Sequence, residues 1–297
     1  MRRPAPPRWR VDLSLVLVAL IWGATFVLVK AALAHISTLL FLTIRFLLAA
    51  VALLLILGRR IQLAQLRTTL RIGALAGVCL FAGYILQTFG LKFTTAGKAG
   101  FLTGLYIPLV PLIAVAIYRK LPQPIETIGI LMAFSGMALI SFVPGQMRMG
   151  LGDFLIVLCA VAFAFHILVL GHFARHADVP GLTVVQIAMG GLIGAGSFWW
   201  AEPVQAHFPA IVWIALLVTS LLATALAFAL QTWAQSYTSA TRTALIFSLE
   251  PVFALAVSWQ FTGEVLSLRA AFGATLILAS ILLVELKPFS PGVHPSN

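Results

Sequence analysis

The chain has 297 residues, of which 61% are hydrophobic and only 9% are charged. A water-soluble domain is about 45–50% apolar and about 25% charged, so this composition excludes an ordinary soluble protein, a disordered chain and a disulfide scaffold. The formal net charge of +11 would suggest a nucleic-acid partner on a soluble protein, but lysine and arginine beside membrane spans set orientation instead, and no such partner is expected.

Continuous apolar runs of about 20 residues, the length of a helical crossing, follow one another along the chain. Such runs favour helices over the short alternating segments of a membrane β-barrel. We therefore predict an all-α, polytopic integral membrane protein with ten transmembrane helices. They are expected at residues 12–33, 37–58, 71–91, 97–117, 124–144, 153–173, 180–200, 210–231, 240–261 and 267–286.

The first run follows four arginines but is longer than the apolar part of a signal peptide and leads directly into a second span, so we expect it to be retained. With the N-terminus inside, 13 lysines and arginines lie in inner segments and four in outer ones, while Lys30 and Arg45 lie within spans. The positive-inside rule then predicts that both termini are cytoplasmic.

A short motif occurs twice in the chain. Leu-Gln-Thr-Phe at 86–89 and Phe-Thr-Thr-Ala at 93–96 return as Leu-Gln-Thr-Trp at 230–233 and Tyr-Thr-Ser-Ala at 237–240, an offset of 144 residues. This repeat predicts two five-helix halves, 1–148 and 149–297. Because each half has an odd number of crossings, the second is inverted, as in many secondary transporters whose site lies near the midplane where the halves meet.

Several short motifs are distributed over both halves of the chain. They are Trp22-Gly23-Ala24-Thr25-Phe26, Arg45-Phe46, Thr94-Thr95-Ala96-Gly97 leading to Pro108, Leu249-Glu250-Pro251-Val252-Phe253, Gly263-Glu264, and the glycine-rich last helix from Gly273. Together these motifs resemble those of the drug/metabolite transporter superfamily, specifically its EamA-type ten-helix permeases. The resemblance implies alternating-access transport of small metabolites, often export of amino acids or related compounds, from the inner membrane of a bacterium. One departure is Arg119-Lys120, which stands where the second half has Gly263-Glu264.

Two charged residues deep in the spans are the first candidates for substrate binding or coupling. Glu250 lies about ten residues into the ninth span, where an ionised acid costs at least about 2.5–3.5 kcal/mol unless it faces a cavity or a partner. It could couple protons, contact a substrate amine, or satisfy backbone freed by Pro251. Arg45 could hold a substrate carboxylate, pair with Glu250, or extend to the interface. Its repeat counterpart, at an offset of 141, is the neutral Gln186.

Neutral polar and aromatic residues extend the candidate site. Tyr84 and Gln87 share a helix face and Gln231 repeats the glutamine, so these side chains could line a path or hydrogen-bond between helices. Trp22 and Tyr106 could form an aromatic wall or simply pack. His166 could relay protons, bind substrate or pack.

Three prolines, Pro108, Pro111 and Pro251, could break their helices near the midplane, where discontinuous helices offer backbone to a ligand. They could equally serve as kinks that set helix shape. His172 and His176 have the spacing of a metal pair but no nearby carboxylate or cysteine, so neither a metal nor another cofactor is expected.

The sequence therefore predicts a secondary transporter for a small organic molecule, with protons as a candidate coupling ion and lipid as its surroundings. It lacks a phosphate-binding Gly-x-x-x-x-Gly-Lys-Ser/Thr loop, so ATP hydrolysis is not expected. Alternatives are a carrier for drug-like cations or nucleotide sugars, an intramembrane enzyme, and a scaffold. An enzyme is disfavoured because the chain has only eight acidic residues. The sequence is compatible with a monomer and does not set the oligomeric state.

Overall fold

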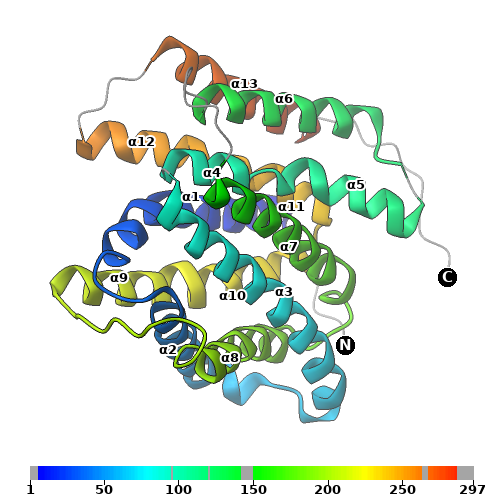
Figure 1. The fold of residues 1–297 in the computed structure, drawn as a ribbon. Helices are drawn as coiled ribbons and strands as arrows, with labels where there is room; N and C mark the ends of the chain where they lie inside the picture. The colour runs from blue at the N-terminus through cyan, green and yellow to red at the C-terminus, as the bar shows by residue number, and fades with distance from the viewer. Residues whose placement is uncertain (1–5, 95, 120, 142–149, 263–266, 286–297) are drawn as a thin grey trace.

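The computed structural model describes residues 6–94, 96–119, 121–141, 150–262 and 267–285. The motif residues Gly263 and Glu264 lie outside these ranges. In the described residues the regular elements are helices, connected by short loops (Figure 1). They are α1 (Arg8–Ala32), α2 (Thr38–Leu57), η1 (Gly58–Arg60), η2 (Leu63–Gln65), α3 (Leu66–Phe93), α4 (Ala96–Thr103), α5 (Tyr106–Tyr118), α6 (Pro124–Ser141), α7 (Leu151–Phe173), α8 (Val179–Ser197), α9 (Ala210–Ser220), η3 (Leu221–Leu226), α10 (Ala227–Gln235), α11 (Ala240–Phe247), α12 (Glu250–Thr262) and α13 (Leu268–Glu285).

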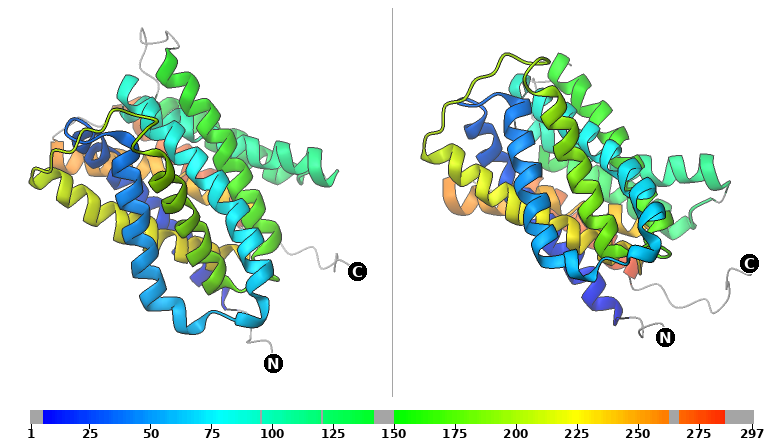
Figure 2. Two further views of the ribbon diagram at one scale, coloured as in Figure 1. Left: turned by 60° about the horizontal axis from the view of Figure 1, so that its bottom comes forward. Right: turned by 90° about the horizontal axis from the view of Figure 1, so that it is seen from below.

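These elements form ten crossings, which confirms the predicted all-α membrane fold. Three crossings are composite: α4 with α5, α11 with α12, and α9 with η3 and α10, where η3 is a π-helical segment. Seven of the described helical stretches are long and apolar enough to span a membrane on their own. An even number of crossings brings the beginning of α1 and the end of α13 toward the same side of the molecule (Figure 2).

The two halves of the chain are interleaved. The most extensive packing pairs α3 with α7, α6 with α13, and α2 with α8, and each pair joins one helix from each half. In Figure 1, α6 and α13 lie side by side along one edge of the molecule, whereas α2 and α8 lie at the opposite edge. The elements between these edges, including α1, α4, α7, α10 and α11, surround the interior of the protein.

Glycine allows the closest of these approaches. A Cβ atom added to Gly136 of α6 would lie 2.5 Å from the carbonyl oxygen of Gly273 in α13. A Cβ atom added to Gly273 would likewise lie 2.5 Å from the carbonyl oxygen of Gly136. Lipid tails give apolar helices little reason to associate, so backbone contact of this kind supplies much of the attraction between them. The pair holds α6 against α13.

The ends of several helices differ from the predicted ones by a few residues. The third helix begins at Leu66 rather than residue 71, because the amphipathic segment that precedes its apolar run is also helical. At the end of α5, Arg119 has φ of 53°, a left-handed conformation that glycine adopts with less strain. Arg119, which stands where the second half of the sequence has Gly263, therefore lies at an unusual helix end.

Candidate functional site

A central cavity lies between the halves of the chain and includes about 690 Å³ of space not filled by atoms, its mouth included. Both halves contribute side chains to its wall. In α1 the lining begins at Trp22 and ends at Val29, so the cavity extends from the middle of this helix toward its end. The lining residues are Trp22, Thr25, Phe26, Val29, Arg45, Leu80, Tyr84, Gln87, Thr88, Leu91, Thr103, Tyr106, Phe163, His166, Ile167, Phe228, Gln231, Phe247 and Glu250.

Two broken helices border this cavity. The chain leaves the α-helix at Gly104 and Leu105, between α4 and α5, and again at Ser248 and Leu249, between α11 and α12. The second pair of residues follows the first by 144 positions, the offset of the sequence repeat. At both breaks a backbone amide donates to the carbonyl three residues earlier instead of four, as in a 3₁₀-helix. The Leu249 amide, for example, donates to the Ile246 carbonyl at 3.1 Å.

The prolines lie at different distances from these breaks. Pro108 is the third residue of α5 and Pro251 is the second residue of α12, positions where the missing amide hydrogen costs no bond within the new helix. Pro111 lies inside α5, which continues to Tyr118. The structure therefore places breaks immediately before Pro108 and Pro251 but none at Pro111.

Glu250 is the first residue of α12 and lines the cavity. Among the described residues its carboxyl group has no hydrogen bond or ion pair. A helix N-terminus favours a negative charge at this position. Gly23 of α1 makes room for the break, since a Cβ atom there would lie 2.5 Å from the Glu250 carbonyl oxygen.

Arg45 is almost completely buried and does not pair with Glu250. Its Nε donates to Thr224 Oγ1 at 2.7 Å, and its Nη2 donates to the Tyr84 hydroxyl at 3.1 Å. The guanidinium carbon also lies 4.5 Å from the centroid of the Tyr84 ring. The predicted Arg45–Glu250 pair is therefore replaced by contacts with Tyr84 and with the π-helical segment that contains Thr224.

The two repeat-related glutamines both reach the cavity, with different partners. Gln87 Nε2 donates to Thr103 Oγ1 at 3.1 Å, which ties α3 to α4. Gln231 Nε2 donates to Gln235 Oε1 at 3.0 Å, one turn further along α10. The Oε1 atom of Gln231 is buried and has no hydrogen-bond partner among the described residues.

His166 lines the cavity, whereas Gln186 lies behind it. His166 Nε2 is 2.8 Å from Gln186 Oε1, and Gln186 Nε2 donates to Thr232 Oγ1 at 2.8 Å. Since Thr232 Oγ1 donates in turn to the Phe228 carbonyl, the chain of bonds assigns the hydrogen of His166 to Nε2. Gln186 is thus a support for His166 rather than part of the cavity wall.

Aromatic rings form much of the remaining wall. The Trp22 ring centroid lies 5.3 Å from that of Phe228 and 5.0 Å from that of Phe247, and Trp22 Nε1 donates to the Ala223 carbonyl at 2.9 Å. Tyr106 also lines the cavity. Sequence reasoning missed Phe228 and Phe247, although the 144-residue offset places them opposite Tyr84 and Thr103 and could have identified them.

The cavity offers little for metal chemistry. Within the part of the chain that the structure describes, no three histidine, cysteine, aspartate or glutamate side chains come together in a way that could hold a metal ion. The His172 ring instead stacks on Tyr118 at a centroid distance of 5.7 Å.

The two ends of the molecule are held together differently. At the end where α1 begins, which we name the Asp12 face, Arg242 Nε and Nη2 donate to the two Asp12 carboxylate oxygens at 3.1 and 2.9 Å. Leu15, Val18 and Ala19, which follow Asp12 by one to two turns of α1, are completely buried. The Asp12 face is therefore closed by an ion pair and a packed apolar layer.

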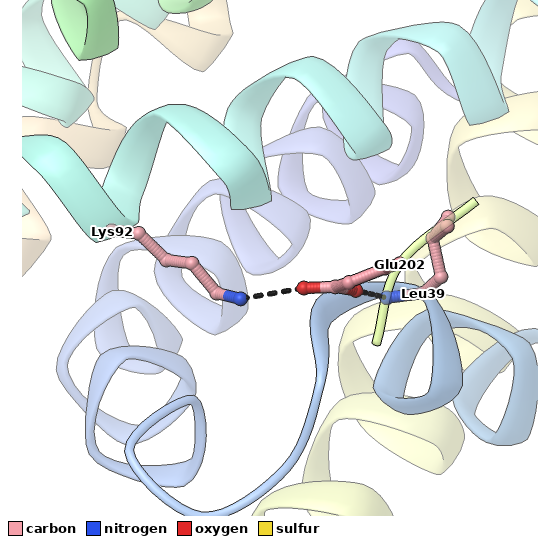
Figure 3. Close-up of polar contacts among 3 residues, drawn as sticks. All are labelled: Leu39, Lys92 and Glu202. Atoms are coloured by element: carbon pink, nitrogen blue, oxygen red, sulfur yellow. Dashed lines mark hydrogen bonds and ion pairs between the residues drawn. The ribbon is translucent and has the colours of Figure 1, made fainter. Parts of the chain in front are cut away.

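At the opposite end, which we name the Lys92 face, Glu202 joins three parts of the chain (Figure 3). Its Oε1 accepts from Lys92 Nζ at 2.7 Å, and its Oε2 accepts from the Leu39 amide at 2.9 Å, which caps α2. Burial alone would raise the pKa of Glu202, but these hydrogen bonds and the Lys92 charge outweigh it and hold the pKa below its ordinary value of 4.5.

Comparisons with known proteins agree with this architecture. The sequence matches the EamA-like transporter family twice, over residues 9–142 and 150–286. An "Uncharacterized transporter" of Archaeoglobus fulgidus is 35% identical over 280 residues, which cover 94% of this chain and 87% of that protein. The "Uncharacterized transporter YvbV" of Bacillus subtilis is 29% identical and covers 95% of this chain and 93% of its own.

A solved structure described as "Crystal structure of protein" has the same fold. It superimposes with a TM-score of 0.80 at 16% identity and covers 94% of this chain and 98% of its own. The relatives named above are transporters and not enzymes, as the sequence predicts for this chain.

Proposed function

Because the chain belongs to the EamA-like transporter family, we propose that this multi-pass membrane protein is a secondary transporter that exports small organic metabolites, namely amino acids or related compounds. It acts by alternating access, without ATP hydrolysis. The inverted halves, taken as 1–148 and 149–297, move against each other around the central cavity.

The observation that carries this proposal is the cavity itself. It lies between the halves, is bordered by two symmetry-related helix breaks, and combines aromatic walls with Arg45, Glu250 and two glutamines. Binding sites of many secondary transporters likewise lie at the repeat interface and are formed by discontinuous helices. A scaffold protein does not require an internal cavity of this kind.

The charge distribution supports an orientation of the protein in the membrane. The positive-inside rule assigns the Asp12 face to the cytoplasm and the Lys92 face to the outside of a bacterial inner membrane. In this orientation the closed Asp12 face separates the cavity from the cytoplasm, which corresponds to a state that releases cargo outward. Glu250 is the candidate group for proton coupling.

A carrier for drug-like cations is a second candidate, which is favoured because the Glu250 carboxyl group has no ion-pair partner in the described part of the chain. A nucleotide sugar fits less well, because its phosphates call for several cations. Arg45 is the single lysine or arginine among the described residues that line the cavity.

Transport by reconstituted vesicles tests the proposal. Purified protein should carry radiolabelled members of an amino-acid and amine panel into proteoliposomes, and unlabelled substrate trapped inside should accelerate uptake by exchange. Empty vesicles are the control. Absence of flux and of exchange across the whole panel, with correctly folded protein, would contradict the proposed function.

A further inference from the structure

The cavity has two hydrogen-bond acceptors that the described protein groups leave unused. One is the carboxyl group of Glu250, which lines the cavity and has no hydrogen bond or ion pair with the described residues. The other is Gln231 Oε1, which is buried without a partner although the residue is only 1% exposed. A buried acceptor without a donor is energetically unfavourable, so a ligand that supplies donors removes this penalty on binding.

The fixed direction of the Gln231 amide strengthens this argument. Its nitrogen already donates to Gln235 Oε1, and Gln235 Nε2 in turn donates to the Ile167 carbonyl at 2.9 Å. This chain of bonds requires that Gln231 present its oxygen, not its nitrogen, as the free atom. A ligand at this position must therefore be a donor.

Part of the positive side of the cavity is occupied. Arg45 uses two of its five N–H donors, because Nε donates to Thr224 and Nη2 donates to Tyr84. A two-pronged contact to a ligand carboxylate through Nε is therefore not available, and Arg45 can contact a carboxylate only through its Nη atoms. The Glu250 carboxyl group and Gln231 Oε1, in contrast, are acceptors that the described residues leave unused.

Aromatic rings lie next to the acceptors along both chains. Phe228 precedes Gln231 by one helical turn, Phe247 precedes Glu250 across the helix break, and Trp22 contacts both rings. The faces of such rings attract organic cations. An ammonium group would find charge, an amide oxygen and aromatic surface in one wall.

We propose that Glu250 and Gln231 form a subsite for the amino group of the substrate, so that a primary amine is required for recognition while a carboxylate is dispensable. The proposal rests on the proposed transport function and specifies its substrate. When the amine binds, one proton is shared between a Glu250 oxygen and the amine nitrogen, and a second N–H donates to Gln231 Oε1. No covalent bond forms or breaks.

A series of ligands with one apolar tail tests the subsite without mutation. The probes are L-leucine, 3-methylbutylamine, which lacks the carboxylate, and 4-methylpentanoic acid and N-acetyl-L-leucine, which lack the free amine. Binding is measured by thermal shift and calorimetry on the purified full-length protein. We expect leucine and the amine to bind with affinities within about tenfold of each other, and the other two to bind about tenfold or more weakly.

Variants then locate the subsite. Glu250→Gln and Gln231→Leu should each weaken 3-methylbutylamine binding by about tenfold or more. The matched control is Glu126→Gln. Glu126 is a carboxylate at the start of α6, outside the central cavity, and it accepts a hydrogen bond from the backbone N–H of Gln123. It should bind the amine as the wild type does.

Three outcomes would overturn the subsite: acids that bind as tightly as the amine, an amine that does not bind to folded wild-type protein, or tight amine binding by folded Glu250→Gln. The wild-type series keeps the proposal falsifiable if a variant fails to fold. Failure of the amine subsite is distinguishable from failure of the transport function. Vesicles that carry acids or acetylated compounds would exclude the amine subsite but would support transport.

Discussion

Arg45 illustrates how a permanent charge is kept inside a membrane-spanning helix. The guanidinium remains protonated in a protein interior, so protein acceptors must replace its lost water. Thr224 and the Tyr84 hydroxyl accept its hydrogen bonds, and the Tyr84 ring lies against its flat face. Arg45 thereby joins α2 to α3 and to the π-helical segment, which gives it a structural task beside any contact with substrate.

The substitution Tyr84→Phe tests this task. It keeps the ring but removes the acceptor for Nη2, and we expect it to lower the stability of the protein by about 1–3 kcal/mol because a charged donor loses its partner. Thermal unfolding of the purified protein measures the change. Tyr106→Phe is the control, since no hydrogen bond joins the Tyr106 hydroxyl to a described residue. Equal stability of both variants would show that the Tyr84 hydroxyl is not needed to keep Arg45 in place.

The helix breaks illustrate what proline does at the scale of an element. Proline lacks an amide hydrogen and clashes with the carbonyl four residues earlier, so a helix tends to end before it. Pro108 and Pro251 lie just after such ends, and the freed backbone forms tight turns there. Pro111 lies within the second turn of α5, where the helix continues, so the type of residue alone did not decide where the breaks fall.

Gly23 allows α1 to pass directly beside one of these breaks. In Gly23→Ala the new Cβ would lie 2.5 Å from the Glu250 carbonyl oxygen and 3.0 Å from the Ala254 amide nitrogen. Backbone atoms cannot move aside as a flexible side chain does, so we expect a loss of about 1–3 kcal/mol of stability and weaker ligand binding.

The matched control for this substitution is Gly100→Ala in α4. Apart from the adjacent residues and the backbone of α4 itself, no heavy atom of the described residues lies within 4 Å of the added Cβ at that position. Alanine favours a helix over glycine by about 1 kcal/mol, so this variant should be as stable as the wild type or more stable. If thermal unfolding shows no difference between the two variants, close contact between α1 and the break is not required.

The Lys92 face should be sensitive to acid through Glu202. The pKa of Glu202 is lower in the folded protein than its ordinary value of 4.5, so the unfolded chain takes up a proton at higher pH than the folded protein does. Its contribution to stability is therefore full well above pH 4.5 and is lost as the pH falls through the lower, folded value.

We expect Glu202→Gln to be less stable than the wild type near neutral pH, and the difference to shrink as the pH falls below about 4.5. Melting temperatures of both proteins across this range measure it. Lys92→Met should show the same trend, since it removes the other partner of the ion pair. A difference that stays constant down to pH 3 would contradict the assignment, because an ionised Glu202 would then contribute nothing specific.

At the scale of the whole molecule, the sequence predicted the features that hydrophobicity and repetition encode. Long apolar runs gave the number of crossings, and the offset of 144 residues related the two breaks. The sequence could not predict the π-helical segment, because its counterpart in α3 is regular helix and its apolar residues suit either form. Nor could it predict the partners of Arg45, since Tyr84 and Thr224 come close only when helices from both halves pack.

The proposed alternating access requires that the closed Asp12 face open in another state. The Asp12–Arg242 pair joins α1 to α11, with each side chain 22% exposed, and the buried Leu15 lies one helical turn further inside. Arg242→Gln removes the two-pronged contact, which should shift the population toward states open at this face. The measurement uses a protein with Cys79→Ser, Cys159→Ala and Leu15→Cys, in which a maleimide reagent labels position 15 when the face opens.

Labelling should be faster when Arg242→Gln is added, whereas the charge exchange Asp12→Arg with Arg242→Asp should return the rate toward that of the parent, because the ion pair is restored with reversed charges. A ligand selective for the state closed at the Asp12 face should slow labelling in every variant. Equal rates in all variants would mean that the apolar layer around Leu15, Val18 and Ala19 keeps this face closed without help from the ion pair.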